Sequence, residues 1–368
     1  MRIALIHEWI SDLGGSEKVL KEILSLFPDY HLFTLFFRKE SLYRLGIDES
    51  RVTASFLNKI RGISKIYRSL LPIFPTAIES LNISDYDVIF SSSHIAAKGV
   101  IPKPYQIHIC YCHTPARYLW DMSNEYLKMR GLDRAPFSII SHTALNYLRL
   151  WDVSTSNRVD YFIANSEYTK RRIKKYYNRD AVVIHPPVEI ERFYSSPKGD
   201  YFLFLSRLVP YKRCDLAVKV FSEIKDRLIV IGDGPEKKRL MKMATKNVKF
   251  TGYLDDEEVR RYLSGARALI YPSEEDFGIT MVEALASGTP VIAFARGGAS
   301  EIVRDIRGSD FPTGILFEEQ SVSSIIEAIE IFKKNEGLFK TDVLIDASKR
   351  FAKQIFDEKI LQFMKNIR

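Results

Sequence analysis

Residues 268–294 read ALIYPSEEDFGITMVEALASGTPVIAF. An apolar run typical of a strand ends near Tyr271, an acidic loop follows, and a helical pattern begins near Gly278. The first turn of a helix leaves backbone amides without intrahelical partners, and such amides bind phosphates or sugar hydroxyls. The stretch therefore predicts a strand, a loop and a helix of a parallel α/β sheet, with a binding turn where the helix starts.

Two carboxylates flank this turn. Glu275 precedes the predicted helix, and Glu283 lies about one turn inside it, at a rise of ~1.5 Å per residue. At this spacing they can accept hydrogen bonds from different hydroxyl-bearing rings of one ligand. The alternative is that acidic residues near a helix start only complement the helix dipole.

The same alternation of short apolar runs and helical patterns extends over the whole chain. It is typical of parallel sheets covered by helices on both faces. A connector rich in Pro, Ser and charge at 186–199 predicts two Rossmann-like domains, 1–185 and 200–349, and a closing helix at about 350–368 completes the first. Strands are predicted near 2–7, 30–36, 86–92, 106–112, 160–165, 181–184, 201–205, 227–231, 248–251, 268–271, 290–294 and 314–317, and an amphipathic helix at 16–27.

The composition fits two globular domains. The 368 residues are 46% hydrophobic and 27% charged, which is ample for two cores. The net charge of +8 indicates a polyanionic partner, whether nucleic acid, anionic lipid or a diphosphate-bearing substrate. Three cysteines without a disulfide-framework spacing favour reduced thiols in the cytosol. No run approaches the ~18 apolar residues of a membrane span, and the N-terminus does not resemble a signal peptide, so we expect any membrane contact to be peripheral.

Further candidate binding residues follow other predicted strands. Arg207 and Lys212 come after the strand at 201–205, where two converging cations suit a diphosphate; simple surface solvation is the alternative for each. Gly14 and Gly15 separate the first strand from its helix, and Gly232 opens a similar turn. Their backbone could approach an anion or a sugar, or they could be structural turns, the first of them capped by Ser or Glu. The first turn is not G-x-G-x-x-G, which disfavours a NAD site.

His113 follows the strand predicted at 106–112, where a ligand-facing group would lie; a core histidine is the alternative. The C-x-C-H arrangement at 110–113 has the wrong spacing for a zinc site, so no metal is expected. Basic and apolar residues share helical spacing over 56–71, which suits either an anionic membrane face or a basic surface helix without a lipid role, and Lys170 to Lys175 has the same ambiguity.

Several of these motifs together resemble the GT-B glycosyltransferases of family 4. They are S-R-L-x-x-x-K at 206–212, G-D-G-P at 232–235, E-x7-E from Glu275 to Glu283, and A-S-G-T-P-V-I-A at 286–293. The GG-x-E at 14–17 and YCHTP-x-RYLWD at 111–121 further resemble mannosyltransferases of bacterial and archaeal O-antigen and polysaccharide assembly. The resemblance covers essentially the whole chain and implies an α/β GT-B fold, with two Rossmann-like domains facing a central cleft and a C-terminal helix that crosses back to the first domain.

The resemblance also implies a role for each candidate residue. Arg207 and Lys212 would hold the donor diphosphate, Glu283 the nucleotide ribose, and Glu275 the hydroxyls of the transferred sugar. His113 would contact the donor sugar near the reacting centre. Backbone groups of the remaining donor-binding residues would approach the donor: Gly14, Gly15, Gly232, Phe277, Gly278 and Ile279.

The function implied is that of a retaining, metal-independent hexosyltransferase without a cofactor, using a nucleotide-diphosphate sugar as co-substrate. Mannose from GDP-mannose and a lipid-linked saccharide acceptor are expected, in the cytoplasm and at the inner face of the membrane. An anionic membrane surface is therefore an expected partner, and nucleic acid is not. The alternatives are a UDP-glucose-type or other nucleotide-sugar transferase, a GT-B epimerase, or a noncatalytic nucleotide-sugar-binding assembly subunit.

Overall fold

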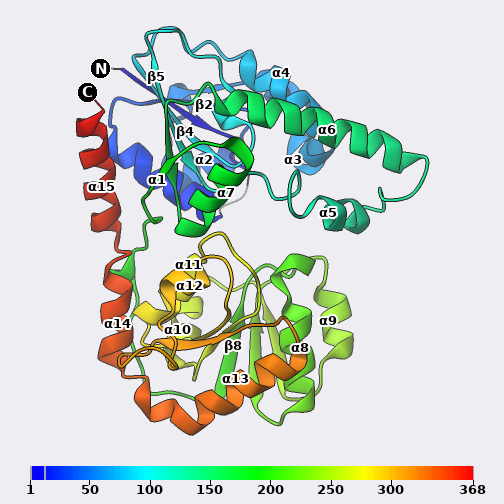
Figure 1. The fold of residues 1–368 in the computed structure, drawn as a ribbon, viewed down its shortest axis with the longest axis vertical. Helices are drawn as coiled ribbons and strands as arrows, with labels where there is room; N and C mark the ends of the chain where they lie inside the picture. Colours follow the sequence, from blue (N-terminus) through cyan, green and yellow to red (C-terminus); the bar gives the residue numbers. More distant parts are fainter. Residues whose placement is uncertain (1, 12–13, 368) are drawn as a thin grey trace. The chain divides into compact units, whose positions relative to one another are not determined.

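The computed structural model describes residues 2–11 and 14–367. The chain divides into two compact units (Figure 1). The N-terminal unit holds residues 1–185 and 359–368, and the C-terminal unit holds residues 186–358. Each unit is built around one parallel sheet.

The N-terminal unit has a seven-stranded sheet in the order β3-β2-β1-β4-β5-β6-β7. Every pairing in it is parallel, and all residues of β1 and β4 are buried, as expected for central strands covered on both faces. The strands are β1 (Ile3–His7), β2 (His31–Thr34), β3 (Val52–Ala54), β4 (Val88–Ser93), β5 (Ile107–Cys112), β6 (Tyr161–Ala164) and β7 (Ala181–Val183).

Helices of very different length connect these strands. The longest is α6 with 20 residues, which extends away from the sheet toward α5 (Figure 1). The α-helices are α1 (Gly15–Leu26), α2 (Lys39–Leu45), α3 (Ile63–Ile66), α4 (Phe74–Glu79), α5 (Ser123–Met129), α6 (Phe137–Ser156) and α7 (Glu167–Tyr177). The 3-10 turns are η1 (Glu49–Arg51), η2 (Phe56–Lys59), η3 (Tyr67–Ser69), η4 (Leu71–Ile73) and η5 (Ala97–Gly99).

The C-terminal unit has a six-stranded parallel sheet in the order β10-β9-β8-β11-β12-β13. The strands are β8 (Tyr201–Leu205), β9 (Arg227–Ile231), β10 (Val248–Gly252), β11 (Leu269–Tyr271), β12 (Val291–Phe294) and β13 (Gly314–Phe317). The helices are α8 (Cys214–Glu223), α9 (Lys237–Met243), α10 (Asp256–Gly265), α11 (Ile279–Ala286), α12 (Ala299–Ile302), α13 (Val322–Asn335), α14 (Thr341–Lys349) and α15 (Lys353–Asn366), with 3-10 turns η6 (Ile190–Arg192), η7 (Pro210–Lys212) and η8 (Glu336–Leu338).

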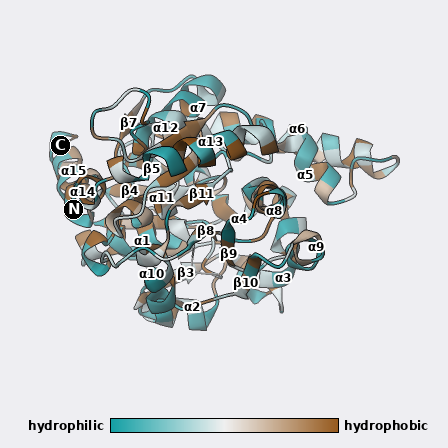
Figure 2. Cartoon of the chain, turned by 90° about the horizontal axis from the view of Figure 1, so that it is seen from below, coloured by the Kyte–Doolittle hydropathy of each residue, from teal (hydrophilic) through white to brown (hydrophobic). Residues whose placement is uncertain are grey.

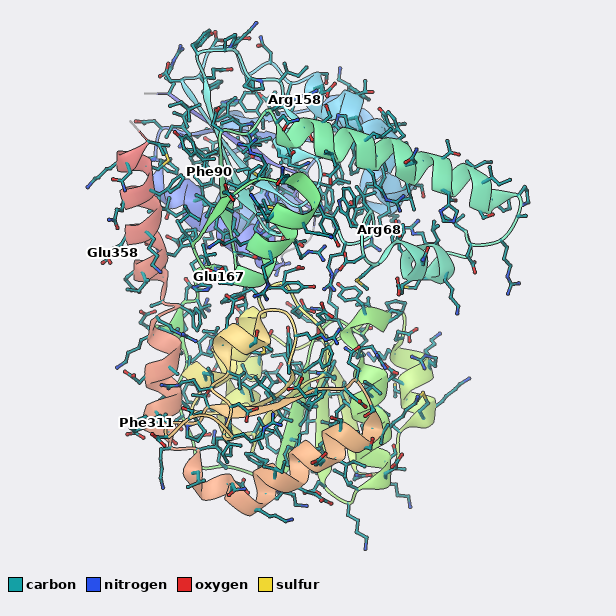
Figure 3. All side chains as sticks on the ribbon, in the orientation of Figure 1. Arg68, Phe90, Arg158, Glu167, Phe311 and Glu358 are labelled. Atoms are coloured by element: carbon teal, nitrogen blue, oxygen red, sulfur yellow. The ribbon has the colours of Figure 1, made fainter. Side chains whose placement is uncertain are left out.

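Apolar side chains fill the space between sheet and helices in both units. Phe90 on β4, labelled in Figure 3, is 1% exposed and packs against Phe27 after α1. Hydrophilic residues dominate outer helices such as α2 and α10 (Figure 2). The N-terminal unit also buries an ion pair, Lys98 with Asp152 at 2.6 Å, which ties η5 to α6. A buried pair of this kind holds its two elements in one arrangement, since separating the charges without water is costly.

The observed strands agree with the predicted ones to within about two residues at either end. Strand β3 was not predicted, because its three residues are too few to show a period. The single amphipathic helix predicted over 56–71 is wrong: the segment forms the short pieces η2, α3, η3 and the start of η4, interrupted at Gly62, which has φ +76°. The closing helix predicted at about 350–368 is present as α15, which begins in the C-terminal unit and ends among residues grouped with the N-terminal one.

Candidate donor-binding site and its family

A cation and a carboxylate meet at the carboxyl edge of the C-terminal sheet. Lys212 ends η7 after β8, Glu275 follows β11, and Lys212 Nζ donates to Glu275 Oε1 at 2.5 Å. Both side chains are largely buried, with 15% and 18% of their surface exposed, so the charge-assisted bond is shielded from water. Arg207 lies on the same loop as Lys212 but is exposed, and its guanidinium donates to the Tyr211 hydroxyl at 3.0 Å. The structure thus brings Lys212 and Glu275 together and leaves the Arg207 fork facing solvent.

The Lys212 loop is held by the residue that follows it. Arg213 adopts φ +55°, a conformation uncommon for a residue with a side chain, and it is the N-cap residue that precedes α8. Its guanidinium donates to Gln320, whose amide donates to the Pro272 carbonyl at 2.7 Å. The loop after β8 is therefore tied through one side chain to the loop after β11, which carries Glu275.

Two glycines hold the Glu275 backbone in place. Gly298 N donates to Glu275 O at 2.9 Å, and Gly297 forms a bridge with Glu275. A Cβ on Gly297 would lie 2.1 Å from Glu275 O, and one on Gly298 would lie 2.2 Å from Phe277 O. Such contacts are shorter than atoms tolerate, so only glycine permits this close approach. We did not predict Gly297 and Gly298 from the sequence, although the pair after a strand was a visible signal.

Helix α11 begins one residue later than predicted. Gly278 precedes α11 with φ +102°, and Ile279 is the first helical residue. Phe277 is 3% exposed and stacks edge-on against Phe351, which fixes the turn from beneath. Glu283 lies in the middle of α11 and is half-buried, among neighbours that are mostly buried. The turn and both carboxylates thus belong to one rigid segment.

Gly232 lies beside the Arg207 loop. Its φ is +137°, and a Cβ there would lie 1.9 Å from Ser206 O. The turn itself therefore requires glycine at this position, which is the structural alternative given above for Gly232. The helix after this turn begins only at Lys237, so Pro235 does not occupy its first position.

In the N-terminal unit, His113 also lies at a sheet edge. It follows β5, is half-buried, and its Nε2 lies 2.8 Å from Ser92 Oγ on β4. Ser92 Oγ lies 3.1 Å from Nδ1 of the buried His7, whose Nε2 is 3.7 Å from Glu17 Oε1. His113 is therefore the outer end of a polar chain. The other members, His7, Ser92 and Glu17, were not predicted as site residues.

The pKa values of His113 and Glu17 determine the charges at the two ends of this chain. The pKa of His113 is lowered to about 3, chiefly because its ring is withdrawn from water and also because His7 and His94 lie nearby. Burial alone would raise the pKa of Glu17, but its interaction with His7 and the hydrogen bond from Ser16 outweigh burial, and the pKa falls to about 2. Near neutral pH, His113 is therefore neutral and Glu17 is ionised.

The glycine turn before α1 is capped from within. Gly14 N donates to Glu17 Oε2 at 2.8 Å, which is the capping alternative considered for this turn. The amide of Gly14 is therefore engaged by the protein itself, contrary to the expectation that it faces an anion. Gly15 is the first residue of α1 and is exposed.

Glu8 is a second buried carboxylate that we did not predict from the sequence. Its Oε1 accepts from the Ser93 hydroxyl and from the consecutive backbone amides of residues 94–97, at 2.7 to 3.1 Å. Burial would raise its pKa, but His94 and these amides lower it below the ordinary value. Glu8 thus fills a turn of convergent amides that would otherwise suit an anion.

Comparison with known proteins places the chain in a family. A profile of the family "Glycosyltransferase Family 4" matches residues 14–192, and one of "Glycosyl transferases group 1" matches residues 188–354. An uncharacterized glycosyltransferase of Methanocaldococcus jannaschii is 30% identical over 100% of this chain and 97% of its own length. The chain belongs to the family 4 glycosyltransferases. The family predicted from the motifs is thereby confirmed.

Other relatives agree with this family. A mannosyltransferase of Mycolicibacterium smegmatis, described as GDP-mannose-dependent and acting on phosphatidylinositol monomannoside, is 29% identical over 47% of this chain and 53% of its own length. The crystal structure of HepE from Anabaena, in complex with UDP-glucose, superposes with a TM-score of 0.70 at 18% identity and covers 100% of both chains. These similarities confirm the predicted GT-B fold of this family 4 glycosyltransferase.

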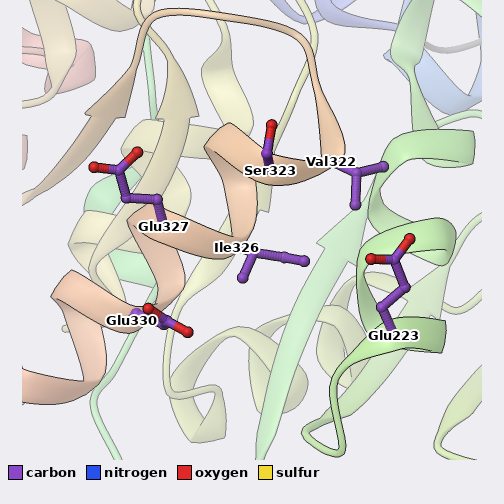
Figure 4. A pocket seen from close by; sticks show the side chains of 6 residues that line it. All are labelled: Glu223, Val322, Ser323, Ile326, Glu327 and Glu330. Atoms are coloured by element: carbon purple, nitrogen blue, oxygen red, sulfur yellow. The ribbon is translucent and has the colours of Figure 1, made fainter.

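One surface pocket of this glycosyltransferase has a volume of about 630 Å³ and lies between α8 and α13 (Figure 4). Its lining contains none of the predicted site residues, and three of its six side chains are acidic: Glu223, Glu327 and Glu330. Carboxylates repel a diphosphate, so we do not assign the nucleotide-sugar donor to this pocket. Within residues 2–11 and 14–367, no three His, Cys, Asp or Glu side chains are grouped so as to hold a metal ion.

Replacing Gly297 by Ala should displace Glu275 and destabilise the C-terminal unit of the glycosyltransferase. The new Cβ would meet the Glu275 carbonyl at 2.1 Å, and φ +72° disfavours a side chain. We expect the free energy of unfolding of this unit to fall by about 2 kcal/mol or more, measured by urea denaturation. Gly308→Ala is the control, since a Cβ there meets nothing within 4 Å. Equal stability of the two variants would contradict this account of Gly297.

Proposed function

We propose that this glycosyltransferase moves mannose from GDP-mannose to a lipid-linked saccharide with retention of the anomeric configuration. The observation that carries the proposal is the shielded contact of Lys212 with Glu275 at the end of two neighbouring strands, with Arg207 on the same loop. Cations at this edge suit the diphosphate of a nucleotide sugar, and a carboxylate beside them suits the hydroxyls of its hexose. The GDP-mannose dependence of the M. smegmatis relative supports the choice of donor.

Charge development at the reacting bond explains why these groups would catalyse transfer. As the glycosidic carbon becomes cationic, negative charge grows on the departing diphosphate. Lys212, Arg207 and the amides before α11 would stabilise that charge, and fixed donors are most effective where charge appears only in the transition state. No metal is needed in this scheme, because protein cations supply the stabilisation.

Retention is proposed to follow from attack on the face that the leaving group departs from. In this scheme a donor phosphate oxygen assists deprotonation of the acceptor hydroxyl, so Glu275 is neither nucleophile nor general base. His113 is proposed to contact a hydroxyl of the transferred sugar.

UDP-glucose is the second candidate donor. HepE binds it and shares the fold, although at 18% identity the likeness does not extend to specificity. A GT-B epimerase would turn over the donor without an acceptor, and a noncatalytic assembly subunit would bind it without turnover. Lys212, Arg207, Glu275 and Glu283 are all present, which favours an enzyme.

Binding and product analysis should distinguish the donors. We expect GDP-mannose to raise the melting temperature more than UDP-glucose does at equal concentration, since a ligand that binds only the folded state stabilises it. The α-linked donor should then yield an α-linked product, read from the one-bond coupling between C1 and H1 of the transferred sugar in NMR. A preference for UDP-glucose would overturn the donor assignment, and a β-linked product would overturn retention.

Lys212→Ala and Glu275→Ala should each lower kcat/KM for transfer by about 100-fold or more, because each removes a fixed charge from the reacting centre. The control is Lys349→Ala, which breaks an ion pair of 3.2 Å with Asp346 on the exposed face of α14. Nucleoside diphosphate release measures the rate, and circular dichroism checks folding. A folded Lys212 or Glu275 variant with unchanged turnover would remove that residue from the mechanism.

An anionic membrane surface is the proposed site of the acceptor. Residues 56–73 contain Lys59, Arg61, Lys65 and Arg68 and no acidic residue, and all four cations are exposed. Arg68, labelled in Figure 3, is close enough to Tyr126 on α5 for its charge to counteract the rise in the pKa of Tyr126 that burial causes. In addition, η4 packs against α6. Four large apolar side chains of α6 are exposed: Ile139, Ile140, Tyr147 and Leu150, by 70%, 67%, 47% and 66%.

Cations beside exposed apolar side chains are the combination that binds the interface of anionic bilayers. The binding would be peripheral: among the described residues, none of the helices has the length and apolar character of a membrane span. Such a surface would bring a lipid-linked acceptor within reach of the enzyme.

Replacing the four cations of residues 56–73 by Gln should reduce co-sedimentation with vesicles that contain anionic lipid. The binding free energy should weaken by about 1 kcal/mol per charge at low salt. The matched control neutralises four exposed lysines of the C-terminal unit, Lys238, Lys242, Lys246 and Lys249. Each variant loses four charges, so only the location differs. Equal sedimentation of the two variants would contradict the assigned surface.

A further inference from the structure

Three neighbouring strands place the polar chain behind His113. β1 and β4 pair in parallel with His7 opposite Ser92, and β4 pairs with β5, which His113 follows directly. His113 N donates to Ser93 O at 2.8 Å, which fixes the residue against the end of β4. Backbone pairing thus sets the positions of His7, Ser92 and His113, and their side chains meet in that order.

The Ser92 hydroxyl couples the proton positions of the two histidines. Its oxygen lies 3.1 Å from His7 Nδ1 and 2.8 Å from His113 Nε2. A hydroxyl has one proton, so it can donate to only one of these nitrogens and must accept from the other. If Nδ1 of His7 is bare, Ser92 donates to it and accepts from a protonated Nε2 of His113. If Nδ1 of His7 carries a proton, the whole arrangement reverses.

Glu17 faces the other nitrogen of His7. Its Oε2 is occupied by Gly14 N at 2.8 Å and Ser16 Oγ at 3.0 Å, while its Oε1 lies 3.7 Å from His7 Nε2. That separation exceeds a direct hydrogen bond, but both side chains are almost fully buried, at 8% and 1% exposure. An ionised carboxylate at this distance favours a proton on Nε2, because the field of the charge is little screened there. When the His7 ring carries a single proton, that proton therefore lies on Nε2 and leaves Nδ1 bare.

We infer that Glu17, His7 and Ser92 are positioning residues that fix His113 as the tautomer protonated on Nε2. His113 then presents a bare Nδ1, which accepts a hydrogen bond from a hydroxyl of the bound ligand. Among the described residues, no side chain or backbone group donates to this Nδ1. The identification of the ligand as the donor sugar rests on the proposed function, but the tautomer itself does not.

A single conservative substitution should reverse the arrangement. In Glu17→Gln, the two donors Gly14 N and Ser16 Oγ select the amide oxygen for the Oε2 position, which keeps the helix cap. The amide NH2 then takes the Oε1 position and presents a donor to His7 Nε2. His7 moves its proton to Nδ1, Ser92 turns to donate to His113, and His113 moves its proton from Nε2 to Nδ1. The number of protons in the chain is unchanged.

The tautomers can be read directly in the full-length, ¹⁵N-labelled protein. Two-bond ¹H–¹⁵N correlation of the seven histidines distinguishes protonated from bare ring nitrogens. Signals are assigned by their loss in His113→Gln and in His7→Gln. We choose pH 8.5, about two units above the ordinary histidine pKa of about 6.5, so that the neutral ring is observed. The control is Glu22→Gln, which makes the same change elsewhere on α1.

We expect His113 to be protonated on Nε2 in the wild type and in Glu22→Gln, and on Nδ1 in Glu17→Gln. In the double variant Ser92→Ala with Glu17→Gln, His113 should show the same tautomer as in Ser92→Ala alone, because the coupling hydroxyl is gone. A wild-type His113 protonated on Nδ1, or a Glu17→Gln spectrum unchanged from wild type, would overturn the inference. If Glu17→Gln does not fold, the wild-type tautomers of His7 and His113 still decide it.

Activity provides a separate readout. With an acceptor turned into a donor, kcat/KM for transfer should fall about tenfold in Glu17→Gln, the size of one lost hydrogen bond. A tautomer change without a change in kcat/KM would overturn the ligand role of Nδ1 and leave the coupling intact. Absence of any transferase activity in the wild type would overturn the proposed function, while the NMR result would stand independently.

Discussion

Parallel hydrogen bonding between neighbouring strands determines where the functional side chains of this protein lie. Because all strands of a parallel sheet end at the same edge, residues that follow different strands meet there. β8 and β11 are neighbours in one sheet, and the loops after them bring Lys212 to Glu275. β1 and β4 are neighbours in the other, and their pairing brings His7 to Ser92. The backbone supplies the positions, and the chemistry of each side chain supplies the interaction.

The second of the two sheets was the easier to predict. Its strands are continuous apolar runs followed by turn signals, and strands 201–205, 227–231 and 314–317 were placed to the residue. Lys212 and Glu275 could be proposed because each follows such a run and each has the charge that a sugar diphosphate requires. Their direct contact could not, because a distance across 63 residues depends on the order of strands in the sheet.

The polar chain behind His113 could not be predicted from the sequence, for a related reason. His7 ends a strand whose other residues are apolar, and Ser92 has no charge that would single it out. Only the register of β1 with β4 shows that their side chains meet. The segment 56–71 misled in the opposite way: its spacing of apolar residues fits a helix, but Gly62 with φ +76° divides it into short turns. Local conformation overrode the period there.

The sheet edges of the two units differ in the charged groups they carry, and this bears on where an anionic donor would bind. In the N-terminal unit, Glu8 accepts from the amides of residues 94–97 and Glu17 accepts from Gly14 N, so the protein's own carboxylates occupy these groups. A diphosphate placed there would compete with a bound carboxylate and meet its charge. In the C-terminal unit, the corresponding edge carries two cations, the exposed Arg207 and Lys212, which contacts Glu275. Under the proposed function, these charges favour a phosphate at the second unit, and a His113 that is neutral near pH 7 suits an uncharged sugar hydroxyl.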